Sequence, residues 1–65
     1  MKGTVELFNE AKGFGFIKPD EGEKHLIVQR GNIIAPSHSL IEGQRVEFEI
    51  IQGEKGLEAV KVNIL

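Results

Sequence analysis

The sequence predicts an all-β domain whose short strands close into a barrel. Apolar and polar residues alternate along several segments, turn-forming residues separate these segments, and no useful stretch has the period of an amphipathic helix. An open sheet this small would leave unpaired edges, which closure removes. We therefore expect one domain over residues 1–65, with strands at residues 2–8, 13–18, 26–28, 45–51 and 57–65.

The segments between these strands contain the residue types that favour turns. Residues 9–13 form a polar connector, and Pro19, Asp20 and Gly22 favour a turn after the second strand. A loop is expected over residues 31–39, which contain Gly, Asn, Pro and Ser, and a hairpin-like connection over residues 52–56. The fourth strand alternates most clearly between apolar and charged residues, which is typical of a strand with one buried face. The expected core residues are Val5, Ile17, Leu26, Val28, Val46, Phe48, Ile50 and Val62.

The run KGFGFI at residues 12–17 is the most informative motif. Because side chains at positions i and i+2 of a strand point to the same face, Phe14 and Phe16 would form one flat aromatic pair. The glycines beside them would leave room for a planar group, and Lys12 adds a positive charge at the edge. Such a surface can stack the bases of a single-stranded nucleic acid. Burial of both rings in the core is the alternative, because Phe is commonly found inside proteins.

Composition limits the classes of function. The chain has no Cys, and His25 and His38 are isolated in the sequence, so we expect no metal site, no cofactor and no catalysis. No signal-peptide pattern or membrane-length apolar run occurs, which predicts a cytoplasmic protein that does not bind membranes. The 10 acidic and 8 basic side chains give a net charge of −2, so any binding of a polyanion must depend on short-range contacts.

In the order of these features, the chain resembles the cold-shock domain family. The matching stretches include KGFGFI at residues 12–17, PDEG at 19–22, EGQ at 42–44, VEFEI at 46–50, and Gly53 with Lys55-Gly56. The resemblance covers nearly the whole chain. It implies a five-stranded antiparallel barrel of the oligonucleotide-binding type that binds single-stranded RNA or DNA on an aromatic face. It also implies that Phe14 and Phe16 lie on that outer face.

Several residues depart from the family pattern on the side that binds the ligand. The family usually has Trp where this chain has Leu7, and Lys where it has Glu6. Its second binding motif has Phe, His and Phe where this chain has Ile27, Gln29 and Arg30. A base stacked on an aromatic side chain contributes about 1–3 kcal/mol, so these replacements predict weakened binding.

We therefore expect a barrel that binds single-stranded RNA or DNA weakly, with little sequence preference, and acts as an RNA chaperone. The alternative is a divergent barrel that has lost this binding and uses its apolar face for a protein partner or for self-association as a weak homodimer. Phe8 extends the platform or packs at the barrel edge, and Arg30 meets the nucleic acid or forms a surface salt bridge. The expected nucleic-acid-binding residues are Leu7, Phe8, Lys12, Phe14, Phe16, Ile27, Arg30 and Lys55.

Overall fold

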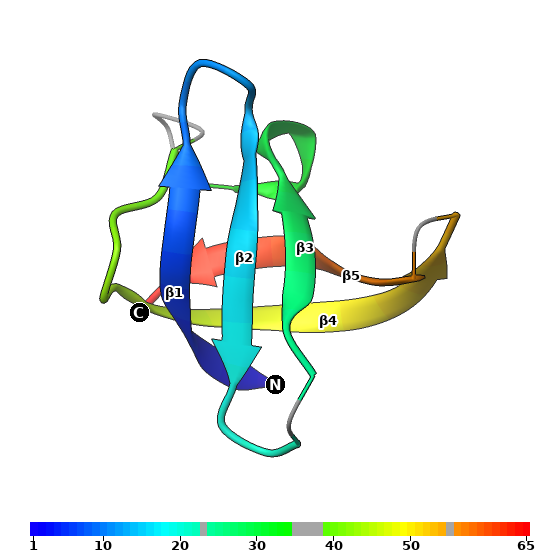
Figure 1. Cartoon of the computed structure of the whole chain (residues 1–65). Helices are drawn as coiled ribbons and strands as arrows, with labels where there is room; N and C mark the ends of the chain where they lie inside the picture. Colours follow the sequence, from blue (N-terminus) through cyan, green and yellow to red (C-terminus); the bar gives the residue numbers. More distant parts are fainter. Residues whose placement is uncertain (23, 35–38, 55) are drawn as a thin grey trace.

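Five strands form one closed barrel in the order β1-β2-β3-β5-β4 (Figure 1). The structure is a computed structural model that describes residues 1–22, 24–34, 39–54 and 56–65. The predicted contact Lys55 and the isolated His38 lie outside these described residues. The elements are β1 (Lys2–Asn9), β2 (Phe14–Pro19), β3 (Leu26–Gln29), the short 3-10 helix η1 (Arg30–Asn32), β4 (Arg45–Gly53) and β5 (Gly56–Ile64).

The strands form two groups that cross each other. In Figure 1, β1, β2 and β3 run side by side across the front, while β4 and β5 pass behind them in a crosswise direction. The long β1 pairs with β2 and, at its first residues, with β4, so that it belongs to both groups. This double pairing and the contact between β3 and β5 close the barrel.

One pairing departs from the expected antiparallel pattern. Strand β3 pairs with β5 in parallel, through Ile27↔Glu58 and Val28↔Ala59, whereas the other four pairings are antiparallel. The reason is the odd number of strands: directions that alternate around a closed ring of five must repeat at one junction. The predicted five-stranded barrel is confirmed, and its closing junction is parallel.

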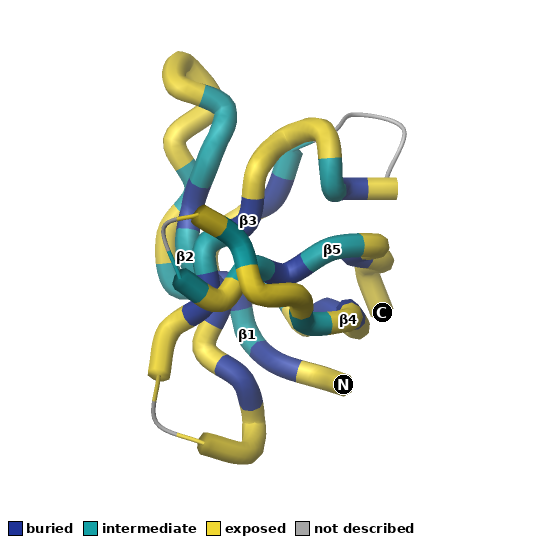
Figure 2. Tube along the Cα trace, turned by 90° about the vertical axis from the view of Figure 1, so that its right-hand side faces the viewer, coloured by how far each residue is buried: buried dark blue, intermediate teal, exposed yellow. Residues whose placement is uncertain are grey.

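Among the described residues, none of the buried side chains is polar or charged. Figure 2 shows where the buried positions lie along the chain. Val46 and Phe48 on β4 are buried between the exposed Arg45, Glu47 and Glu49, as the alternation predicts. Ile50, predicted as core, is only half-buried and packs against the core from the side. The buried core residues are Val5, Ile17, Leu26, Val28, Ile33, Leu40, Val46, Phe48, Ala59 and Val62.

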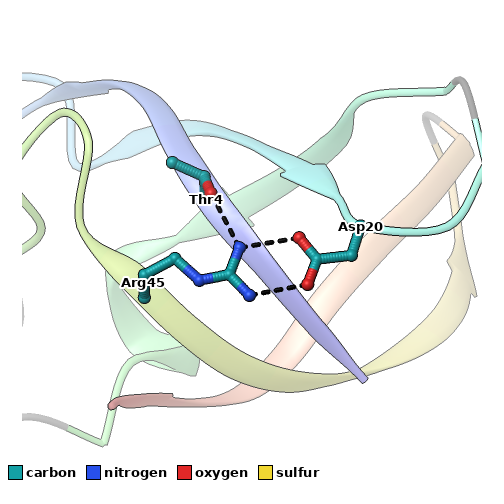
Figure 3. A network of polar contacts seen from close by, with 3 residues as sticks. All are labelled: Thr4, Asp20 and Arg45. Carbon is teal, nitrogen blue, oxygen red and sulfur yellow. Dashed lines mark hydrogen bonds and ion pairs between the residues drawn. The ribbon is translucent and has the colours of Figure 1, made fainter.

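Arg45, the first residue of β4, bonds to Thr4 on β1 and to Asp20 directly after β2 (Figure 3). Arg45 donates two hydrogen bonds to the Asp20 carboxylate, at 2.7 and 2.6 Å, and one to Thr4 Oγ1 at 2.9 Å. These bonds tie the start of β4 to β1 and to the residue that follows β2. The hydrogen bonds from Arg45 hold the pKa of Asp20 below its ordinary value, and Asp20 raises the pKa of Arg45.

Candidate nucleic-acid interface

A row of side chains crosses four strands on the outside of the barrel. Leu7 on β1 lies opposite Phe16 on β2, and Phe16 lies opposite Ile27 on β3. Ile27 in turn neighbours Glu58 on β5. Residues directly opposite each other in a sheet point to the same face, so Leu7, Phe16, Ile27 and Glu58 share one surface. Phe14 stands two residues before Phe16 on β2 and points to the same face. We call the four apolar residues Leu7, Phe14, Phe16 and Ile27 the outer platform.

A β-bulge in β1 brings Leu7 to this surface. Val5 is buried and pairs with Ile17, so simple alternation would also turn Leu7 inward. The register shifts between Val5 and Leu7, because Glu6 is an extra residue in β1. An extra residue exchanges the two faces of the strand beyond it. Leu7 is consequently 51% exposed.

The same bulge turns Phe8 towards the barrel. Phe8 pairs with the buried Gly15, is half-buried and packs against the core cluster. Of the two predicted positions for Phe8, the structure therefore shows packing at the barrel rather than extension of the platform. A Cβ atom on Gly15 would overlap the Leu7 carbonyl oxygen and approach the Phe8 ring. The prediction that this glycine leaves room for a planar ligand is wrong: it allows β1 to pack closely on β2.

Phe14 and Phe16 lie on the outer surface, each half-buried. Their ring centroids are 6.2 Å apart and the ring planes are inclined by 83°. The prediction of one flat pair is therefore wrong, because two rings packed edge to face place their flat faces in different directions. Such an arrangement offers separate surfaces for stacking instead of one shared plane.

The predicted cation Lys12 lies in the turn between β1 and β2, and the side chain of Arg30 reaches the same turn from η1. Lys12 is exposed, and its backbone N–H donates to Asn9 Oδ1 at 3.1 Å, which fixes the turn. The Arg30 guanidinium passes over Gly13 and donates a hydrogen bond to the Glu10 carbonyl oxygen. Within the described part of the chain Arg30 has no ion pair, so the salt-bridge alternative is not observed there.

Carboxylates flank the platform at both edges. At β1, Glu6 Oε1 lies 2.7 Å from His25 Nδ1. At β5, Glu58 Oε1 accepts a hydrogen bond of 3.1 Å from Gln29 Nε2. Glu58 was not predicted as a platform neighbour, because only the parallel pairing of β3 with β5 places it there. The alternation along β5 predicts that the half-buried Glu58 points outward, but not which residues lie beside it.

Ile27 occupies the centre of a shallow groove. Three cavities of about 220, 220 and 300 Å³ share this residue in their lining. One cavity of about 220 Å³ is also lined by Lys12, Gly13, Phe14 and Gln29. The other cavity of about 220 Å³ is also lined by Gln29, Glu54 and Glu58. The cavity of about 300 Å³ is also lined by Lys24, His25, Gln52, Gly56 and Leu57. Among the residues that the structure describes, no group of three or more His, Cys, Asp or Glu side chains is arranged to hold a metal ion. Nor does any helix in the described ranges have the length and apolarity to cross a membrane.

The structure brings together four of the predicted site residues on one face, the members of the outer platform. Lys12 and Arg30 lie beside this face, at the β1–β2 turn. Phe8 lies on the opposite side of the sheet. The arrangement offers apolar and aromatic surface next to two cations, with acidic groups on either side.

Comparison with known proteins agrees with this geometry. The family model described as "'Cold-shock' DNA-binding domain" matches residues 1–65. The cold shock-like protein CspE of Escherichia coli is 51% identical over 63 residues, which cover 95% of this chain and 91% of the relative. The cold shock-like protein CspC of Buchnera aphidicola has the same identity and coverage. CspC of Escherichia coli is 48% identical over 100% of this chain and 96% of its own length.

A solved structure has the same fold. A structure of Drosophila Unr (CSD456) superposes with a TM-score of 0.82 at 28% identity, covering 98% of this chain and 26% of that chain. The relatives support nucleic-acid binding rather than the alternative of a barrel that has lost it. The chain therefore belongs to the cold-shock DNA-binding domain family, whose members bind nucleic acid.

Proposed function

We propose that this chain binds single-stranded RNA or DNA on the outer platform, weakly and with little sequence preference, and acts as an RNA chaperone. The observation that carries this is the row Leu7, Phe16 and Ile27, which presents apolar surface across three strands on the outside of the barrel. Bases have flat apolar faces, and an unpaired strand can lay them on such a surface. A duplex hides those faces, so it would bind less well.

The proposed affinity is micromolar or weaker at moderate salt. Stacking of two bases on Phe14 and Phe16 would contribute about 2–6 kcal/mol, whereas a Kd of 1 μM requires about 8 kcal/mol. Phosphate contacts from Lys12, Arg30 and Lys55 would have to supply much of the remainder. With a net charge of −2 and few phosphates neutralised, the salt dependence should be shallow.

Titration with a pyrimidine-rich single strand at low salt, followed by amide NMR shifts, tests this proposal. We expect the largest shifts at residues 13–16 and 27–30, with smaller ones at their neighbours Leu7 and Glu58, and much smaller shifts overall with a duplex of the same sequence. Shifts scattered over the barrel, or none, would refute the proposed surface. Nanomolar affinity at about 0.15 M salt with a steep salt slope would refute the proposed weakness.

Other features of the proposal follow from the sequence. We assign the chain no catalytic step and no cofactor, and we predict a cytoplasmic location, which cell fractionation would test. A weak homodimer also stays a prediction. Sedimentation across a range of protein concentrations would detect it, and a sedimentation coefficient that does not change with concentration would contradict it.

A further inference from the structure

The platform ends at β5 with a carboxylate. Glu58 continues the row from Ile27, and these two residues line one cavity together with Gln29 and Glu54. A base stacked over Ile27 would therefore have a carboxylate beside it. This position can read the edge of a base, which a stacking surface alone cannot do.

Gln29 is oriented by its contact with Glu58. Its Nε2 donates to Glu58 Oε1 at 3.1 Å. Because a carboxylate only accepts hydrogen bonds, the amide must turn its NH₂ group towards Glu58 and its carbonyl oxygen away. Gln29 lies opposite Phe14, so that this oxygen belongs to the platform side of the sheet. The two side chains together present acceptors at this edge.

The last residue of β4 provides a seat for the Glu58 carboxylate. A Cβ atom on Gly53 would overlap Glu58 Oε2 and lie too close to its carboxyl carbon. The carboxylate thus rests against bare backbone, in space that any other residue at position 53 would occupy. Together with the bond from Gln29, this contact limits the positions that the carboxylate can adopt.

We propose that Glu58, supported by Gln29, makes this end of the platform selective for guanine, an inference that rests on the proposed function. Guanine presents two neighbouring donors, N1–H and the N2 amino group, which match the two acceptor oxygens of a carboxylate. Adenine and cytosine present one amino group beside a ring acceptor. Uracil and thymine present a single N–H between two carbonyl oxygens, which the acceptors of Glu58 and Gln29 would repel.

The charges on either side of the groove agree with this orientation. Lys12 lines the cavity on the Phe14 side, while Glu54 and Glu58 line the cavity on the β5 side. Phosphates are attracted to Lys12 and repelled by Glu54 and Glu58. Where a bound strand passes Ile27, its phosphates should therefore lie on the Lys12 side and its base edges should point towards Glu58.

Heptathymidine and derivatives with one replaced base are suitable probes. A strand that slides along the platform can bring a single dG to Glu58 from any position. Wild-type protein should bind the dG derivative about fivefold or more tightly than heptathymidine, the lower end of the discrimination given by a bidentate base contact. Deoxyinosine keeps N1–H but lacks the N2 amino group, so most of that gain should disappear. Equal affinities for the dG derivative and heptathymidine, or for dG and deoxyinosine, would overturn the inference.

Three variants separate the role of Glu58 from a general effect of charge. Glu58→Gln should abolish the dG preference, while Glu47→Gln, which removes the same charge from an exposed site on β4, should keep it. Glu47 pairs with Asn63, which is about 17 Å from Glu58 along β5. Gly53→Ala retains the carboxylate but displaces it, and should weaken the preference as well. Amide spectra would verify that each variant is folded.

The outcomes distinguish this inference from the proposed function. A dG preference that survives Glu58→Gln would overturn the inference while leaving single-strand binding intact. Failure of the wild-type protein to bind any of the strands would refute the proposed function and the inference together.

Discussion

Replacing Phe16 and Phe48 separately by Ala should separate binding from stability. Phe48 is 1% exposed in the core, so its truncation should cost the ~3–5 kcal/mol of a buried Phe→Ala change. A domain of this length has a total stability of only about 3–10 kcal/mol. Phe48→Ala should therefore be largely unfolded, or melt ~12–40 °C lower than wild type.

Phe16 is half-buried on the outer platform, and its truncation leaves an open surface instead of a closed cavity. The stability loss should be on the order of 1 kcal/mol, about half the value for burying a whole Phe side chain. Affinity for a single strand should fall by about 1–3 kcal/mol, or roughly five- to 150-fold.

Thermal melts of wild type, Phe16→Ala, Phe14→Ala and Phe48→Ala, with titrations of the folded variants, are sufficient to test this reasoning. Phe14→Ala should behave like Phe16→Ala, because the two rings share the outer surface. Equal, large losses of stability in all three variants would mean that the platform rings are core. Unchanged affinity in stable Phe14→Ala and Phe16→Ala would mean that the rings do not contact the ligand.

Three further predictions concern the platform and the ion pair between Asp20 and Arg45. Leu7→Trp combined with Ile27→Phe should increase affinity by about 1–3 kcal/mol per restored ring with little change in melting temperature; an unfolded double variant would contradict their outward placement. Glu6→Lys should increase affinity and steepen the salt dependence of binding by the amount expected for about one more phosphate contact. Titrations at several salt concentrations would measure this, and unchanged binding would mean that the strand does not pass Glu6. Arg45 lowers the pKa of Asp20 in the folded protein. The pair should therefore stabilise the fold fully above pH ~3.9, the ordinary pKa of Asp, and this stabilisation should be lost as the pH falls through the pKa of Asp20 in the folded state. Melts of wild type and Asp20→Asn should therefore converge in acid, and a constant difference down to low pH would argue against the pair.

The sequence predicts the parts of the fold that local alternation determines. In β4, Val46 and Phe48 are buried and their neighbours are exposed, because successive side chains of this strand alternate between the core and the solvent. A period of two is enough to assign faces in such a strand. The predicted turns that contain Gly13 and Gly22 also have the positive φ angles that favour glycine.

Features that depend on pairing between distant strands were not predictable in this way. Ile33 belongs to the segment predicted as loop but joins the core, because it bridges to Val62 and not to its neighbours in sequence. Leu40, directly after that segment, is also buried in the core. The bulge at Glu6 reverses the faces of Leu7 and Phe8, and nothing in the local pattern of β1 marks it. The exposed position of Leu7 could be expected only from the family resemblance.

Side chains alternate between the inner and the outer face of each strand. Substitutions on the outer face can therefore change what the barrel binds, while the inward residues continue to form the core. The replaced residues Leu7, Ile27 and Gln29 all lie on the outer side, where they leave the buried cluster untouched. Gly15 is different, since it is buried against β1 and directly beside the outer pair Leu7 and Phe16. A side chain at Gly15 would push β1 away and separate these two platform residues. The platform therefore tolerates exchange of its outer side chains but depends on the close β1–β2 contact that the glycine allows.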